Sequence, residues 1–258
     1  MTLTVARRMI GAEILKVRRN RSVMAVALLL TVGSIVLMYG YVAIRHGSDP
    51  LNNPPAGGAE GLRRGILDLG RFFGMLAAVL IGAEVGTADL SSGVFRDLVS
   101  TGRSRLALFA VRLPAAAIVT LSLSAVAYAI ALAFAFALPG GTPTPSLGLV
   151  LQGAGWIALA NIAVAAVSVG VGSLTGSRAV TLTAIIGWQV ILTNIVLNVG
   201  SLGGARDVLL TPALDQLLPV ASPDNSVVMA TGLGIVVVCA WVGLSQAVGA
   251  WRTRTQDA

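Results

Sequence analysis

The sequence predicts an all-α membrane protein with six transmembrane helices, and three observations lead to this prediction. Hydrophobic residues make up 55% of the 258 residues and charged residues only 11%, with a mean hydropathy of +0.85. Six apolar stretches reach the roughly 20 residues that a helix needs to cross the hydrocarbon core of a bilayer. The Lys and Arg residues fall in short blocks between these stretches. Soluble domains average about 25% charged residues, so a lipid bilayer is the expected solvent of this chain.

The six predicted spans form one transmembrane domain over residues 1–258. Positive charge is held on the cytoplasmic side of a membrane during insertion. With the amino terminus inside, thirteen of the 18 basic residues fall on the cytoplasmic side, so we expect both termini there. The spans cover about residues 23–44, 66–88, 106–138, 147–174, 179–199 and 227–250.

The first span superficially resembles a secretory signal because a basic segment precedes it. Its apolar run is too long for a signal core, and it ends in Tyr41-Val42-Ala43-Ile44 without a small-x-small cleavage pattern. We therefore expect this span to be retained.

Residues 1–22 are expected to form an amphipathic helix in the cytoplasmic interface. Apolar residues recur at helical spacing at Leu3, Ala6, Ile10, Ile14 and Val17, with basic residues around them. Such a helix places its apolar side toward the acyl chains and its basic side toward the anionic headgroups of membrane lipids. A solvated basic leader that only fixes the topology is the alternative.

The first external loop, about residues 45–65, is rich in Gly, Pro and Asn and is expected to be irregular. Residues 60–71 differ, because they indicate a helical lead-in to the second span. In this lead-in Arg64, Asp68 and Arg71 fall at i, i+4 and i+7 and are expected to pair along one face.

The last external loop, about residues 200–226, is predicted to contain a short helix. Thr211-Pro212 is a helix-start signal, Leu214, Leu217 and Leu218 form an apolar stripe, and Pro219 ends the segment. We expect an interfacial or re-entrant helix that forms an external lid.

Pairs of glycines at four-residue spacing predict close helix packing, because helices in membranes associate through small residues. These pairs are Gly70 with Gly74, Gly82 with Gly86, and Gly172 with Gly176.

No catalytic constellation, metal-ligand spacing or cofactor motif is present in the sequence, so the chain is not expected to be an enzyme. The only histidine, His46, falls in an external loop, and the lone Cys239 is expected to be a small packing residue. The single lysine, Lys16, follows Ile14-Leu15 and not the Gly-rich turn of a phosphate-binding loop. Nucleic-acid binding is not expected, because the basic residues do not form one soluble face.

Glu84, near the cytoplasmic end of the second span, is the candidate gate or coupling residue, because an acidic group inside a span is costly. Alternatively, its carboxylate reaches the interface and pairs with Arg96, Arg103 or Arg105. Five amide side chains can line a polar path or hydrogen-bond neighbouring helices: Gln152, Asn161, Gln189, Asn194 and Asn198.

The cytoplasmic loop of residues 89–105 is the most informative segment. Asp89 or Ser91 can cap a short helix and Gly102 can end it. Its apolar face would comprise Leu90, Val94, Phe95 and Leu98. Such a helix suits a groove on a partner protein, although a structural elbow between two spans would be amphipathic too.

This loop resembles that of the ABC type-2 transporter permeases. The residues that carry the resemblance are Gly82, Glu84, Gly86-Thr87, Arg96 with Leu98, and Ser104-Arg105. The resemblance implies a second permease, identical or similar, and two cytoplasmic ATPase subunits that bind ATP and Mg. It assigns Glu84 to the gate or to the electrostatic anchoring of the gate, and it assigns ATPase docking to Asp89, Leu90, Ser91, Val94, Phe95, Arg96, Leu98, Arg103 and Arg105.

The expected function is therefore ATP-driven export of an amphipathic substrate from the cytoplasm. Abundant Ala, Gly and Arg beside one Lys indicate a bacterium with a GC-rich genome, which makes the inner (plasma) membrane the expected location. Three alternatives remain: a membrane enzyme, a non-transporting membrane scaffold, and a stand-alone secondary transporter or channel. The last would carry ion-coupling carboxylates or broken helices near the bilayer midplane.

Overall fold

The computed structural model describes residues 3–100, 102–218, 227 and 229–255, and these residues form helices and connections without a β-strand. Six helical segments in the described chain are long and apolar enough to cross a membrane, as in a multi-pass membrane protein. They are Arg21–Ser48, Gly58–Ser91, Arg105–Ala137, Leu147–Thr175, Arg178–Asn198 and Thr231–Thr255. The predicted all-α class and the six apolar helices are therefore confirmed, with boundaries shifted by up to eight residues.

Several spans consist of more than one helical element. The first contains α2 (Arg21–Leu28), the π-helical η1 (Leu29–Gly33) and α3 (Ser34–Ser48). The second contains α4 (Gly58–Leu67), the π-helical η2 (Asp68–Phe72) and α5 (Phe73–Ser91). The third contains α7 (Arg105–Ala110) and α8 (Arg112–Ala137), and the fourth is α9 (Leu147–Thr175). The fifth contains α10 (Arg178–Ile186), the π-helical η3 (Gly187–Leu192) and α11 (Thr193–Asn198), and the sixth is α13 (Thr231–Thr255).

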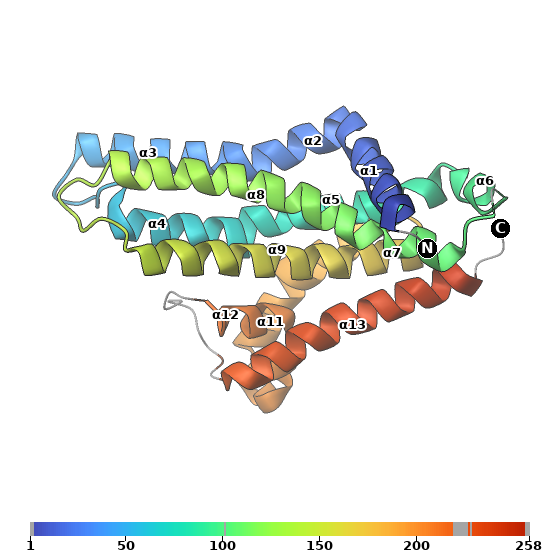
Figure 1. Cartoon of the computed structure of the whole chain (residues 1–258). Helices are drawn as coiled ribbons and strands as arrows, with labels where there is room; N and C mark the ends of the chain where they lie inside the picture. Colours follow the sequence, from blue (N-terminus) through green and yellow to red (C-terminus); the bar gives the residue numbers. More distant parts are fainter. Residues whose placement is uncertain (1–2, 101, 219–226, 228, 256–258) are drawn as a thin grey trace.

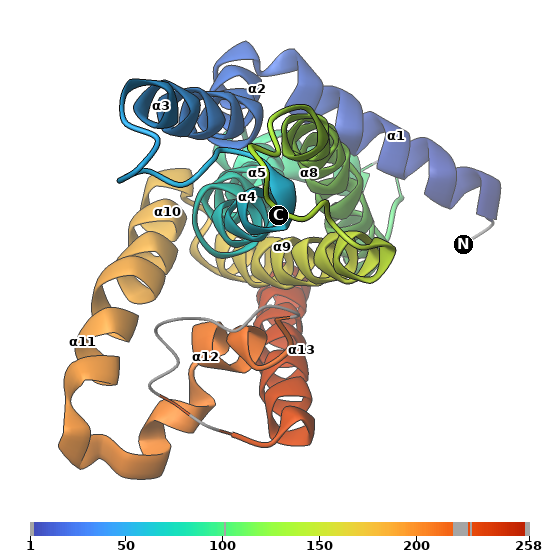
Figure 2. The same cartoon turned by 90° about the vertical axis from the view of Figure 1, so that its left-hand side faces the viewer.

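Four further elements lie outside these six spans. They are α1 (Leu3–Arg19), α6 (Val94–Ser100), the 3₁₀ helix η4 (Gly200–Val208) and α12 (Leu210–Asp215). The start of α1, the end of α13 and α6 lie at one end, which we call the termini end (Figure 1). The α3–α4 and α8–α9 connections lie at the opposite end, which we call the far end (Figure 1). Figure 2 shows α11 projecting away from the bundle of α3, α4, α5, α8 and α9, whereas α10 lies against α5 and α13 against α9.

The centre of the bundle is the close contact between α5 and α9. A Cβ atom added to Gly86 would lie 2.8 Å from the carbonyl oxygen of Val169, and one added to Gly82 would lie 2.6 Å from that of Ala165. Gly172 faces Gly86 across the same contact. The backbones can touch only because side chains are missing at these positions. Gly176, by contrast, ends α9 with a φ of +67° and does not pack against another helix.

Polar side chains of α9 hold the second span in place. Asn161 donates its amide to the Leu69 carbonyl at 3.2 Å and to Ser124 Oγ at 3.0 Å, and Ser168 donates to the Val79 carbonyl at 2.7 Å. Leu69 lies in η2, where π-helical geometry displaces the usual i to i−4 bonds. Asn161 thus bonds neighbouring helices, whereas Asn194 and Asn198 donate to carbonyls of their own helix.

The expected pairing of Arg64, Asp68 and Arg71 along one face is wrong. Arg64 lies 3.9 Å from Glu60, and Arg71 lies 3.3 Å from Asp215 of α12. The π-helical turn that begins at Asp68 supplies the reason, because its additional residue rotates the following side chains relative to those of α4.

A short helix is present in the last predicted loop, but it begins differently from the prediction. Its N-cap is Leu209, and the Thr211 hydroxyl donates to Gln189 Oε1 at 3.3 Å instead of capping the helix. Leu214 is buried, and its carbonyl accepts a hydrogen bond from the Trp156 indole at 2.9 Å, which ties α12 to α9. Pro219 lies outside the described residues.

Candidate coupling site at the termini end

The loop between the second and third spans contains α6, flanked by two tight turns. Gly93 and Gly102 have φ values of +73° and +81°, which glycine adopts at little cost. Asp89, Leu90 and Ser91, predicted to begin the loop helix, lie instead in the last turn of α5. The Asp89 side chain is buried against α1, so it is not available to bind a partner.

The side chains of α6 divide between the bundle and the exterior. Val94 is 41% exposed, whereas Phe95 is 4% exposed and lies under the guanidinium of Arg112, 5.9 Å from it. Leu98 is half-buried. The side chain of Arg96 lies outside the described part of the chain. The apolar face that was predicted to meet a partner is therefore divided, because Phe95 points inward.

Of the two arginines that close the loop, Arg105 contacts α13. Arg103 is exposed in the turn after α6, and Arg105 is the first residue of α7. Arg105 Nη1 donates to the carbonyl of Arg254, near the end of α13, at 3.2 Å. This bond joins the loop to the last span.

A cluster of charged and polar side chains lies directly behind α6, and we call it the termini-end cluster. Lys16 of α1 donates to Glu13 at 2.5 Å and to Asp89 of α5 at 2.6 Å. Burial raises the pKa of Glu13, with a further contribution from Asp89 and with Lys16 opposing it. Burial disfavours the charged form of Lys16, yet its two hydrogen bonds raise the pKa of Lys16 above the ordinary value. The cluster comprises Glu13, Lys16, Asn20, Glu84, Asp89, Arg112, Ser173 and Arg178.

Glu84 joins two other elements and not the loop. Its carboxylate accepts from Asn20 Nδ2 at 2.8 Å and from Arg178 Nη1 at 2.9 Å, with only 13% of the side chain exposed. Among the described side chains, Glu84 therefore pairs with neither Arg103 nor Arg105. Because α5 continues to Ser91, Glu84 lies about 10 Å before the helix end. At that depth it faces the start of α10.

Arg112 is fully buried at the start of α8. Its Nη1 donates to Ser173 Oγ at 2.9 Å and to the Gly86 carbonyl at 3.4 Å. Asp89 and Glu13 act electrostatically on its charge. Its Nε and Nη2 atoms have no hydrogen-bond partner among the described residues. A buried guanidinium with unused donors depends strongly on the carboxylates around it.

Together these contacts connect five helices at the termini end. Three carboxylates and three cations join α1, α5, α8 and α10, and Ser173 adds α9. The side chains of Lys16 and Arg178 are 36% and 45% exposed, so removing one of them costs less than the ~3–5 kcal/mol of a fully buried ion pair. Relative movement of these helices would break or exchange these contacts.

Sequence reasoning missed most of this cluster. Arg112 lies inside the predicted third span, and an ionisable residue within an apolar run is the same signal that identified Glu84. Glu13 precedes Lys16 by three residues, a spacing at which helical side chains meet. The distant pairs, such as Arg178 with Glu84, carry no signal in the sequence because they depend on which helices are neighbours.

The chain's only lysine gives the cluster a testable pH dependence. The folded-state pKa of Lys16 exceeds the ordinary 10.5, so the stability it contributes is complete below that pH and is lost as the pH rises through the folded-state pKa. Thermal unfolding in detergent between about pH 9 and pH 12 is expected to show a steeper loss for wild type than for Lys16→Met. Arg19→Met, an exposed change on the same helix, should behave like wild type. Superimposable profiles for wild type and Lys16→Met would contradict this assignment.

Comparison with known proteins adds no assignment to this site. No protein-family model matches the chain, and no curated protein matches it significantly. Among the described residues, no group of three or more His, Cys, Asp or Glu side chains could hold a metal ion.

Proposed function

We propose that this chain is the membrane-spanning permease subunit of an ATP-driven exporter whose ATP, with Mg, is bound by a separate cytoplasmic subunit. The observation that carries the proposal is α6. This short helix stands between two glycine turns at the termini end, is held by Phe95 on Arg112, and leaves Val94 exposed. A helix fixed on one side and open on the other suits docking into a groove of a partner.

The termini-end cluster provides contacts through which a movement of α6 would be transmitted to the bundle. Phe95 contacts Arg112, which bonds Gly86 of α5 and Ser173 of α9. A displacement of α6 by a closing ATPase would thus act on the α5–α9 contact at the centre of the bundle. The energetic requirement is that ATP changes the relative free energies of two bundle arrangements. Glu84 is proposed as the coupling residue that exchanges partners between these arrangements.

A second permease, identical or similar, is the proposed partner within the membrane. The apolar windows of the fifth and sixth spans are each only 22% buried within this chain, whereas that of α9 is 72% buried. Helices this poorly covered need lipid or another subunit around them.

The proposal places the termini end in the cytoplasm of a bacterial cell and the far end outside the inner membrane. In this orientation α1 is the interfacial helix, its basic side toward anionic lipids. The short α12, tied to the bundle through Arg71 and Trp156, would be the external helix over the pathway.

Reconstitution tests the proposed function directly. Liposomes that contain this chain and its ATPase are expected to move substrate only with ATP, and liposomes with the chain alone should show no net transport. Full transport by the chain alone, driven by an ion gradient, would instead favour the stand-alone secondary transporter.

A further inference from the structure

A polar cavity of about 310 Å³ lies between the second and fifth spans, away from the termini-end cluster. The ten-residue helix α4 runs inward from the far end of the bundle, and the cavity begins where α4 ends. Its polar lining is Asp68, Arg71, Gln189, Thr193, Asn194 and Thr211, and its apolar lining includes Phe72, Met75 and Leu197. A polar hollow at this depth is costly unless something occupies it.

Two interrupted helices face each other across this cavity. The π-helical η2 contributes Asp68, Arg71 and Phe72, and the π-helical η3 contributes Gln189 and Val190. Single π-helical turns inside α-helices are frequent at functional sites, because they displace side chains from the regular helix face. Here the displacement sends Arg71 to Asp215 and leaves Asp68 in the cavity wall.

Asp68 is the carboxylate of the cavity wall that has no ion pair among the described residues. Arg71 is paired with Asp215, while Arg63 and Arg64 both lie against Glu60, outside the cavity lining. The Asp68 carboxylate has no hydrogen bond or ion pair within the described ranges, although Arg64 acts on it from a longer distance. A cation beside Asp68 would supply the direct counter-charge that this carboxylate lacks.

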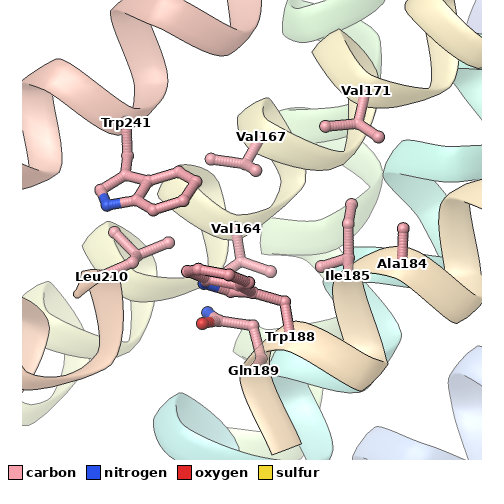
Figure 3. A pocket seen from close by; sticks show the side chains of 9 residues that line it. All are labelled: Val164, Val167, Val171, Ala184, Ile185, Trp188, Gln189, Leu210 and Trp241. Carbon is pink, nitrogen blue, oxygen red and sulfur yellow. The ribbon is translucent and has the colours of Figure 1, made fainter. Parts of the chain in front are cut away.

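An apolar pocket of about 230 Å³ adjoins the polar cavity, and Gln189 lines both (Figure 3). Trp188 and Trp241, whose ring centroids are 5.9 Å apart, line this pocket together with Val164 and Val167 (Figure 3). Gln189 is 6% exposed, and its Nε2 has no partner within the described ranges except the Met75 sulfur at 4.0 Å. Gln189 thus has a buried amide group whose N–H donors lack a strong acceptor among the described residues, at the boundary between the two pockets. Such a group indicates a site that binds a ligand.

We propose that these two adjoining hollows form a binding site for a lipophilic organic cation, with the positive charge beside Asp68 and the apolar body beside Trp188 and Trp241. Aromatic rings accommodate such cations because their faces are electronegative. The inference deepens the proposed function by naming a substrate class. Binding, however, requires neither ATP nor a second subunit.

The test is equilibrium binding of radiolabelled tetraphenylphosphonium to the purified full chain in neutral detergent. Tetraphenylborate, which has the same shape and the opposite charge, is the matched probe. Wild type is expected to bind the cation saturably and to prefer it over the anion. Asp68→Asn, which keeps the shape of the side chain, should weaken cation binding by about tenfold or more. Glu60→Gln, an exposed carboxylate change on α4, should leave binding unchanged.

Equal affinity of wild type and Asp68→Asn, with unchanged thermal stability of the variant, would overturn the proposal. Equal binding of tetraphenylborate would overturn it as well. Displacement of the probe by phosphatidylethanolamine would assign the site to a lipid headgroup and likewise reject it. Trp188→Leu is a second test variant. It should weaken binding of tetraphenylphosphonium but leave the preference for the cation over the anion unchanged. The binding assay contains no ATPase. Failure of ATP-driven transport in liposomes, with cation binding intact, would therefore contradict only the proposed function.

Discussion

Protein carrying Val94→Asp is expected to insert and fold normally but to lose ATP-driven transport by about tenfold or more. Val94 is an exposed apolar residue of α6, so a carboxylate there meets water in the isolated chain. In the assembled exporter, the same carboxylate would be buried against the ATPase. Burying a charge without a partner costs several kcal/mol. The measurement is substrate uptake into liposomes that contain both subunits, together with the thermal stability of the isolated variant.

The matched control for this variant is Thr255→Asp. Thr255 is exposed in the last turn of α13, at the termini end. A carboxylate there adds the same charge to the same end of the bundle without entering the proposed interface, so transport should remain. Wild-type transport by Val94→Asp, or equal loss in both variants, would remove α6 from the mechanism.

Gly86→Leu is expected to have the largest effect on stability. The backbone of α9 occupies the space that a side chain at Gly86 would need, with the Val169 carbonyl 2.8 Å from the Cβ position. Neither backbone can move aside as a flexible side chain would. Overpacking of this kind costs about 1–3 kcal/mol and sometimes more. The variant should also disturb the Gly86 carbonyl that accepts from Arg112.

The control for this prediction is Gly155→Leu, which lies on the exposed side of α9 with nothing near its Cβ position. Its melting temperature in detergent should match that of wild type, whereas Gly86→Leu should melt several degrees lower. If both variants melted alike, the α5–α9 contact would not be the centre of the fold.

Hydropathy and length were sufficient to predict the six apolar helices, because a bilayer imposes a minimum length on any helix that crosses it. The α5–α9 contact was predictable in part for a similar reason. Gly82, Gly86 and Gly172 belong to spacings that membrane helices use for close approach. Gly176 has the same four-residue spacing but ends α9 instead of packing against another helix. Sequence spacing does not separate these two roles, because glycine also commonly ends helices.

The partners of the charged residues were not predictable. Glu84 meets Asn20 and Arg178 because α5 lies beside the start of α2 and of α10, an arrangement that no local spacing encodes. Arg64, Asp68 and Arg71 were predicted to share one helix face. The additional residue of the π-helical η2 rotates the side chains that follow it, so the three residues do not share one face. The direction of Phe95 was likewise undetermined, since a short amphipathic helix can turn its apolar side toward the bundle or toward a partner.

Site-specific photo-crosslinking tests the central claim most directly. The full chain would carry p-benzoylphenylalanine at position 94, or at position 51 as a control, because Leu51 is 97% exposed at the far end. The account predicts that irradiation of native membranes joins position 94 to a protein with a nucleotide-binding Walker motif, and that position 51 gives no such product. An ATPase adduct from position 51, or its absence from position 94 in membranes that carry out ATP-driven transport, would contradict the account.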